Sequence, residues 1–191
     1  SLAVVFESPA VGGVSLRKTW TFKRGSYIVD VTHDVINGGA QPVQPQLYTQ
    51  LVRDGNPPAG ESSFYFTFTG PAVYTDASKF RKVDFSDIEK GKVDIDKSAQ
   101  DGWVGMVQHY FTSAWLLPPN TPREFRAAKV SDNLYSIAMV QTLPALAAGA
   151  SHKVDAQLYA GPQADLKLAA IAPGPALGKD YGWFPILRKP P

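Results

Sequence analysis

Hydrophobic and polar residues alternate along much of the chain, which is the period of a β-strand with one buried face. From Val14 to Phe22 the even positions are mostly apolar, and residues 27–35 alternate in the same way. Gly25 lies in the short turn between these runs, so the pattern predicts a β-hairpin. The Asn37-Gly38-Gly39 sequence predicts the end of its second strand.

Further strands are expected along the rest of the pattern. Phe64, Phe66 and Phe68 alternate with Tyr and Thr residues and form the clearest half-buried strand in the sequence. Residues 103–117 are apolar and aromatic but too long for one ordinary strand, so we expect two strands bent near Tyr110 and ended by the following prolines. Shorter strands are predicted at residues 47–53, 72–74, 81–85, 125–130, 135–142 and 154–160.

Two segments favour helix. Residues 86–90 can form one helical turn, with Ser86 as its N-cap and Glu89 three residues later. Pro162 suits a first helical position, and residues 163–171 are rich in Ala and Leu. We therefore expect a mainly β, antiparallel sandwich over residues 1–160 and a helical tail over residues 161–191 that packs on it, as one domain.

Composition supports a folded β domain and limits its partners. Of the 191 residues, 44% are hydrophobic and 19% are charged, which is enough apolar surface for a core. The net charge is +2, and the densest basic cluster, at residues 79–82, is balanced by nearby aspartates, so nucleic acid is not an expected partner. No apolar run approaches the roughly 20 residues that span a bilayer. The absence of cysteine removes disulfides and thiolate chemistry.

Candidate catalytic residues are sparse. His33, His109 and His152 lie far apart in sequence and form no metal-binding motif, and His33 falls in the apolar register of its strand. Asp94 and Asp96 would share one face of a strand, but the lysines beside them favour a charged loop. Ser113 lacks the glycines of a nucleophile elbow, and no phosphate-binding or calcium loop is present. The sequence therefore predicts neither an enzyme, nor a cofactor, nor a metal site.

The end of the chain has a different character. Trp183 and Phe184 follow the predicted helix and lie beside Arg188 and Lys189. Aromatic and basic side chains together are typical of a segment that approaches a membrane interface. Tyr181, Trp183, Phe184 and Arg188 are therefore the candidate interaction or membrane-proximal residues.

Four segments, in order along the chain, resemble the periplasmic domain of the bacterial membrane protein insertase YidC. The first is WTFKRGSY at residues 20–27, followed by Val29 and Val31 of the next strand. The second and most distinctive is GWVGMVQHYFTSAW at residues 102–115. YAGP at residues 159–162 resembles a strand-to-helix junction of that domain, and LGKDYGW at residues 177–183 resembles its approach to the next membrane helix.

The resemblance implies an antiparallel β-supersandwich, the architecture also used by galactose mutarotases, with a short C-terminal helical segment. It implies a non-catalytic domain at the periplasmic face of the bacterial inner membrane, tethered in the full-length protein. Its implied partners are nascent membrane proteins and the Sec translocon accessory proteins SecD and SecF, and its implied role is that of a chaperone in protein transport.

Two departures from the family pattern stand out. The family domain has further strands upstream of Ser1, and after Trp183 it continues into an apolar helix, where this chain has Pro185 and Arg188. The alternative function is a carbohydrate-binding or mutarotase-like protein on the same fold. That alternative requires a histidine and a carboxylate that converge in one pocket.

Overall fold

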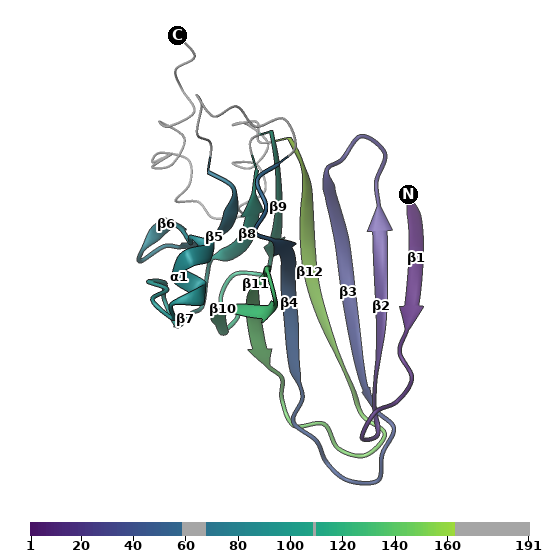
Figure 1. Ribbon diagram of the computed structural model, residues 1–191. Coiled ribbons are helices and arrows are strands. Elements are labelled where there is room, and N and C mark those ends of the chain that lie inside the picture. The colour runs from purple at the N-terminus through teal and green to yellow at the C-terminus, as the bar shows by residue number, and fades with distance from the viewer. Residues whose placement is uncertain (59–67, 109, 163–191) are drawn as a thin grey trace.

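The computed structural model of the chain describes residues 1–58, 68–108 and 110–162. Within these residues two antiparallel sheets face each other, and one of them is twice as wide as the other (Figure 1). The larger sheet has the spatial order β1–β2–β3–β12–β9–β8–β5–β6, and the smaller sheet has the order β4–β11–β10–β7. The predicted class, a mainly β antiparallel supersandwich, is confirmed.

The elements have the following bounds. The larger sheet contains β1 (Leu2–Glu7), β2 (Val14–Phe22), β3 (Ile28–Asn37), β5 (Gly70–Thr75), β6 (Lys79–Lys82), β8 (Trp103–Val107), β9 (Phe111–Leu116) and β12 (Ser151–Pro162). The smaller sheet contains β4 (Gln46–Asp54), β7 (Ser98–Ala99), β10 (Arg123–Ser131) and β11 (Leu134–Thr142), and the short helix α1 spans Phe85–Glu89.

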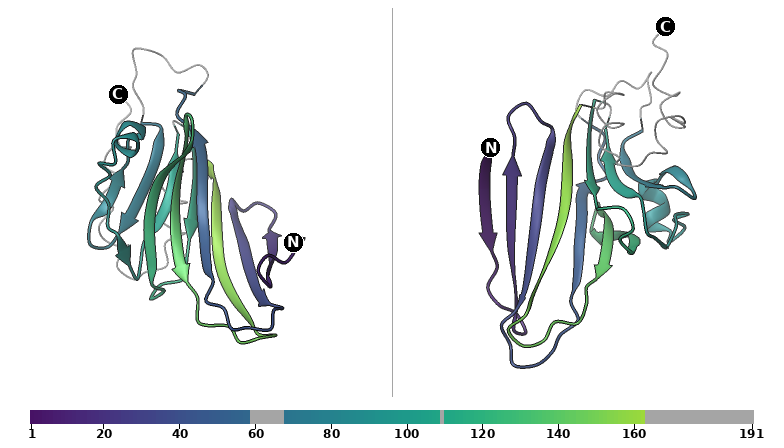
Figure 2. Two further views of the ribbon diagram at one scale, coloured as in Figure 1. Left: turned by 60° about the horizontal axis from the view of Figure 1, so that its bottom comes forward. Right: turned by 180° about the vertical axis from the view of Figure 1, so that it is seen from behind.

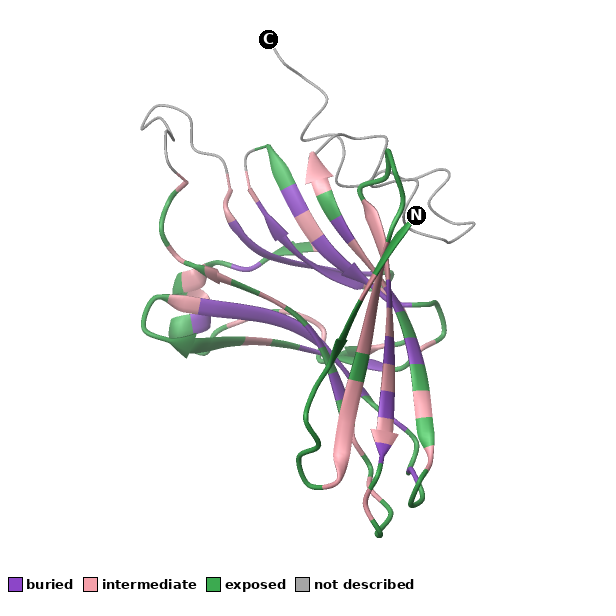
Figure 3. Ribbon diagram, turned by 90° about the vertical axis from the view of Figure 1, so that its right-hand side faces the viewer, coloured by how far each residue is buried: buried purple, intermediate pink, exposed green. Residues whose placement is uncertain are grey.

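The alternation explains how the sheets pack. Val31 of β3, Ala156 of β12 and Trp115 of β9 point toward the smaller sheet and meet Ile137 and Met139 of β11. We call this side of the larger sheet its inner face. A second cluster, around Tyr74, Trp103, Ala114, Leu116 and Tyr159, occupies the opposite, outer face. Figure 3 shows buried residues gathered between the sheets, whereas β1 at the edge is exposed along most of its length.

The lower end of the sandwich in Figure 1 is closed by two loops that Asn37 joins. The Asn37 side chain is fully buried, and its Nδ2 donates hydrogen bonds to the carbonyls of Gln41, Leu146 and Ala147. A buried amide with all of these partners fixes the connection between β3 and β4 against the connection between β11 and β12. The two loops lie side by side in both views of Figure 2.

Several sequence predictions are confirmed and some are wrong. The β2–β3 hairpin, the end of β3 at Asn37 and the pair of strands within residues 103–117 are confirmed. The strand expected at residues 81–85 is present with other bounds, because β6 spans Lys79–Lys82 and Phe85 begins α1. Ser86 is wrong as the N-cap, since Asp84 occupies that position with extended backbone angles.

Other differences concern the chain ends and one internal strand. β1 and the short β7 were not expected, and most of the strand expected at residues 64–69 lies outside the described residues. The helix was expected to begin at Pro162, but β12 continues through this residue, which pairs with Phe111. The remainder of the predicted tail lies outside the described residues and stays a prediction.

Gly102 gives a test of the turn before β8. Its φ is +90°, and a Cβ there would lie 2.1 Å from the backbone oxygen of Tyr74. We expect Gly102→Ala to lower the free energy of unfolding by about 3 kcal/mol or more, measured by urea denaturation. Gly149 is the matched control, because its φ is +76° but a Cβ would meet no atom within 4 Å. Gly149→Ala should cost only about 1 kcal/mol, and equal losses for the two variants would contradict this.

Candidate interaction surfaces

The residues predicted to carry an interaction fall in the C-terminal tail. Tyr181, Trp183, Phe184 and Arg188 lie outside the described residues, as does His109. Their role therefore remains a prediction. The described residues offer three other features: a buried histidine, two connected grooves, and a buried arginine that shapes them.

His33 lies on the inner face in a cluster of aromatic side chains. It is 1% exposed, and its ring centre lies 6.2 Å from that of Trp115. Lys18, its neighbour on β2, places Nζ 4.6 Å from the ring centre of Trp20 and 5.2 Å from that of Trp115. Two cation–π contacts hold this half-buried ammonium group against the indoles.

Burial, followed by the charge of Lys18, lowers the pKa of His33 from its ordinary value of 6.5 to about 4. The imidazole is therefore neutral near pH 7, and its Nδ1 has no hydrogen-bond partner. The charges of Asp34 and Asp155 act in the opposite direction and raise the His33 pKa, but both carboxylates occupy positions on the outer face of the sheet. His33 is a packed core residue, as its register in the sequence predicted.

Two grooves run beside β12 and share Pro118 and Asp155 in their walls. The first groove, of about 370 Å³, is lined by residues 30–32, 116–119 and 155–157. Its floor contains two cross-strand pairs, in which Thr32 donates a hydrogen bond to Asp155 and Gln157 donates one to Asp30. The second groove, of about 320 Å³, is lined by Pro118, Thr121, Pro122 and residues 141–144 and 152–155.

His152 and Asp155 both line the second groove but do not form a catalytic pair. Three positions apart on one strand, they project to opposite faces of the sheet, and no hydrogen bond joins them. Both reach the groove because it follows the edge of β12. Neither His33 nor His152 therefore meets a carboxylate in the way that the mutarotase-like alternative requires.

Arg123 holds the carbonyl of Pro118, a residue that lines both grooves. It is 2% exposed, and its guanidinium donates hydrogen bonds to the carbonyls of Thr121, Gly102, Gln100 and Pro118 at distances of 2.6 to 3.2 Å. Burial lowers its pKa to about 10, so the group stays charged at neutral pH. A charged donor shared by four carbonyls fixes the connection from β9 to β10 against the turn that precedes β8.

The two aspartates considered in the sequence do not act as an acid–base pair. Asp96 accepts hydrogen bonds from the hydroxyls of Thr75 and Ser78, and these bonds lower its pKa. The side chain thus joins the β5–β6 turn to the segment before β7. Asp94 is exposed.

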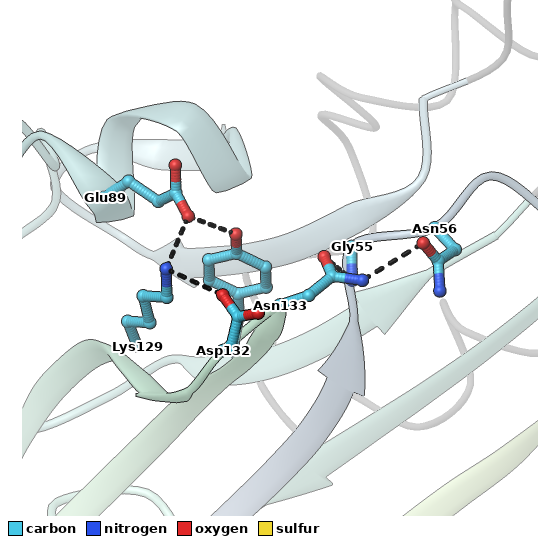
Figure 4. Close-up of polar contacts among 7 residues, drawn as sticks. Gly55, Asn56, Glu89, Lys129, Asp132 and Asn133 are labelled. Carbon is cyan, nitrogen blue, oxygen red and sulfur yellow. Dashed lines mark hydrogen bonds and ion pairs between the residues drawn. The ribbon is translucent and has the colours of Figure 1, made fainter.

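A polar network at the β10–β11 turn has a structural role as well (Figure 4). Glu89 of α1 accepts hydrogen bonds from Lys129 Nζ at 2.9 Å and from the Tyr135 hydroxyl at 2.7 Å. These contacts, with Lys129 first, lower the pKa of Glu89. On the other side of the turn, Asn133 bonds to the Gly55 N–H and to Asn56. The turn therefore connects α1 with the end of β4.

Metal-binding clusters and membrane-spanning helices are both missing from the described part of the chain. In residues 1–58, 68–108 and 110–162, His, Asp and Glu side chains nowhere gather in threes as a metal ion would require. The same residues include no helix that is both long and apolar enough to cross a membrane.

Comparison with solved structures defines the class of the fold. An X-ray structure of a galactose mutarotase related enzyme from Lactobacillus acidophilus superposes with a TM-score of 0.51, covering 85% of this chain and 68% of that one. The two sequences are 9% identical, so the likeness shows the fold alone. The chain is a galactose mutarotase-like β-sandwich.

Sequence comparison then gives the family. The model of the YidC periplasmic domain matches residues 1–190. A membrane protein insertase YidC from Janthinobacterium sp. (strain Marseille) is 53% identical over 178 residues, which cover 93% of this chain and 32% of that protein. The one from Laribacter hongkongensis (strain HLHK9) is 45% identical over 199 residues, which cover all of this chain and 36% of that protein. The chain belongs to the YidC periplasmic domain family and spans about a third of the length of these relatives.

His33 predicts how stability depends on pH. In the unfolded chain His33 binds a proton below about pH 6.5, whereas in the folded chain it binds one only below about pH 4. Stability is therefore fully present above pH 6.5 and falls, by up to about 3 kcal/mol, as the pH drops toward 4. We expect His33→Gln to remove this dependence in denaturant unfolding between pH 4.5 and 7. His152→Gln, on the half-buried histidine of β12, should retain it, and an unchanged slope in His33→Gln would contradict the assignment.

Arg123 predicts a large loss of stability on truncation. Arg123→Met leaves four carbonyls without their donor and should lower the free energy of unfolding by about 3–5 kcal/mol in urea titrations. Arg123→Lys keeps the charge but has a different donor geometry, so its free energy of unfolding should lie between those of the unaltered protein and Arg123→Met. Arg126→Met is the control, because the Arg126 side chain is exposed where it pairs with Glu124, and it should leave stability nearly unchanged. Similar losses for the two Met variants would rule out a special role for Arg123.

Proposed function

We propose that the chain is the non-catalytic periplasmic domain of a membrane protein insertase, and that it assists the insertion and folding of inner-membrane proteins by contacts with other chains. This proposal is carried by the match of residues 1–190 to the family model. It is also supported by relatives named membrane protein insertase YidC, which are about 50% identical to this chain. In this proposal the domain lies at the periplasmic face of the bacterial inner membrane and is tethered there by parts of the full-length protein beyond this chain.

The polar groups of the sandwich support a scaffold. Arg123 holds a loop, Asp96 holds a turn, Glu89 anchors α1, and His33 is neutral and enclosed. Each of these groups is engaged in maintaining the fold, and none is presented to a reactant. A rigid sandwich of this kind offers its surfaces and strand edges for binding.

The proposed partners are nascent membrane proteins and the Sec accessory proteins SecD and SecF. The proposed contact or membrane-proximal residues are Tyr181, Trp183, Phe184 and Arg188, because aromatic and basic side chains together suit a membrane interface or an apolar partner. This part of the proposal rests on the sequence.

The test is partner recovery with the full-length insertase. We expect substitution of Tyr181, Trp183, Phe184 and Arg188 by alanine to reduce copurification of SecD and SecF, and crosslinking to a nascent inner-membrane protein, several-fold. The urea midpoint of the isolated chain should not change. The control carries alanine at two exposed positions on the sandwich, Val11 (78% exposed) and Val130 (54% exposed).

The outcomes distinguish a role of the four tail residues from a role of the domain as a whole. Full partner recovery in the four-residue variant would remove the tail from the proposal. If SecD, SecF and substrate crosslinks persist both in the tail variant and after deletion of residues 1–190, the proposed function as a whole is overturned.

A further inference from the structure

Strand β12 is paired over different lengths on its two sides. Residues 151–159 pair with β3, whereas on the other side β9 pairs only with residues 157–162. Among the described residues, no strand pairs with residues 151–156 on that side, so they form an open edge in the middle of the larger sheet. Exposed edges of this kind are places where another chain can add a strand.

The hydrogen-bonding register identifies which groups face this edge. Asn37 N–H donates to the Ala150 carbonyl, and Ala160 N–H donates to the Tyr27 carbonyl, so even-numbered residues of β12 bond to β3. Because bonding alternates along an antiparallel strand, the N–H and C=O groups of Lys153 and Asp155 face the open side. Neither residue has a backbone partner there among the described residues.

Pro118 explains why β9 does not cover this edge. Leu116 pairs with Gln157, so in the same register Pro118 comes opposite Asp155. Proline has no N–H to donate to the ladder, and the Pro118 carbonyl already accepts a hydrogen bond from Arg123 Nη2 at 2.6 Å. The chain leaves the sheet at this point, and the edge of β12 continues into the second groove.

The second groove also contains an unpaired side chain. Gln141 of β11 lies in its wall and is 5% exposed, yet its Oε1 has no hydrogen-bond partner. A buried polar atom without a partner is uncommon in native proteins. Gln141 lines the same groove as Lys153, and the other walls of this groove combine apolar residues, among them Pro118, Pro122, Leu143 and Pro144, with polar ones such as Thr121.

We propose that the open edge of β12, at residues 151–155, is a strand-addition site for an extended peptide segment of a partner protein. The added segment would pair with the main chain of Lys153 and place apolar side chains against the prolines of the groove. Five residues of β12 span about 14 Å at about 3.4 Å per residue, so the site takes a segment of three to five residues. The proposal rests on the strand edge and is independent of the proposed role in membrane-protein insertion.

A peptide fits the site better than a sugar does. The unpaired main-chain groups are two N–H donors and two carbonyl acceptors spaced along a strand, which an extended main chain matches. A sugar would rely on side chains such as His152 and Asp155, and these project to opposite faces of the sheet. Sugar binding is therefore an outcome that the experiment must be able to detect.

The probe is the blocked peptide Ac-Val-Thr-Val-Thr-Val-NH₂, titrated into the isotopically labelled 191-residue chain and followed by amide NMR shifts. We expect saturable shifts at the Lys153 and Asp155 amides and at the Gln141 side chain. A peptide N-methylated at its three central residues should bind about fivefold more weakly for each hydrogen bond that it loses. This comparison uses the unaltered protein and does not depend on how a variant folds.

Substitutions in the protein test the same edge independently of changes to the peptide. Lys153→Pro removes the N–H that faces the groove while it leaves the bonds to β3 in place, so binding should fall about fivefold or more with little change in the urea midpoint. Lys153→Ala, which keeps the N–H, is the matched control and should bind normally. Gln141→Leu should weaken binding through the loss of its acceptor.

Three results would overturn the proposal. They are no saturable shifts up to about 10 mM peptide, equal binding by the N-methylated peptide, and unchanged binding by a folded Lys153→Pro variant. Saturable shifts of the groove residues with galactose but not with the peptide would assign the groove to a sugar and would overturn it too.

Discussion

The arrangement of the sandwich around β12 depends on one buried guanidinium. Arg123 begins β10 in the smaller sheet, yet its side chain bonds to carbonyls before β8 and after β9, in the larger sheet. Four main-chain acceptors without a donor would be costly in an enclosed place, and a single planar cation with donors in a fixed fork satisfies them together. The two sheets are therefore joined by a polar contact as well as by their apolar core.

The same contact determines the surface beside β12. Because Arg123 holds the Pro118 carbonyl, the chain leaves β9 where the proline has already removed a ladder donor. The segment that follows forms a wall of both grooves, and beyond it the edge of β12 has no pairing strand within the part of the chain that the structure describes. A structural hydrogen bond thus leaves an open edge in the centre of a wide sheet, where edges are usually absent.

Much of the fold could be predicted from sequence because period-two alternation reports directly on burial. β2 and β3 were recognised in this way, and inward residues of β3, such as Val31, are core residues. β1 was missed because it is an edge strand that is exposed on both faces, so its side chains carry no strong alternation. The N-cap was misplaced by two residues because Asp84 and Ser86 are both acceptable N-caps, and only the backbone angles distinguish them.

The surfaces beside β12 were less predictable. Lys153 and Asp155 look like ordinary surface residues in the sequence. Their main-chain groups are unpaired because β9, which is distant in sequence, ends before it reaches them. Arg123 gives no local signal either, because its partners lie up to 23 residues away. Pro118-Pro119 was recognised as the end of a strand, and this is the one sequence feature that pointed to the break in the ladder.

Residue-by-residue amide hydrogen exchange of the chain tests the break in the ladder most directly. Since unpaired amides exchange quickly and ladder amides exchange slowly, Lys153 and Asp155 should exchange far faster than Val154 and Ala156, whose N–H groups bond to β3. Uniform slow exchange across these four residues would mean that the edge of β12 is already covered, and would contradict the conclusion that Arg123 and Pro118 keep it open.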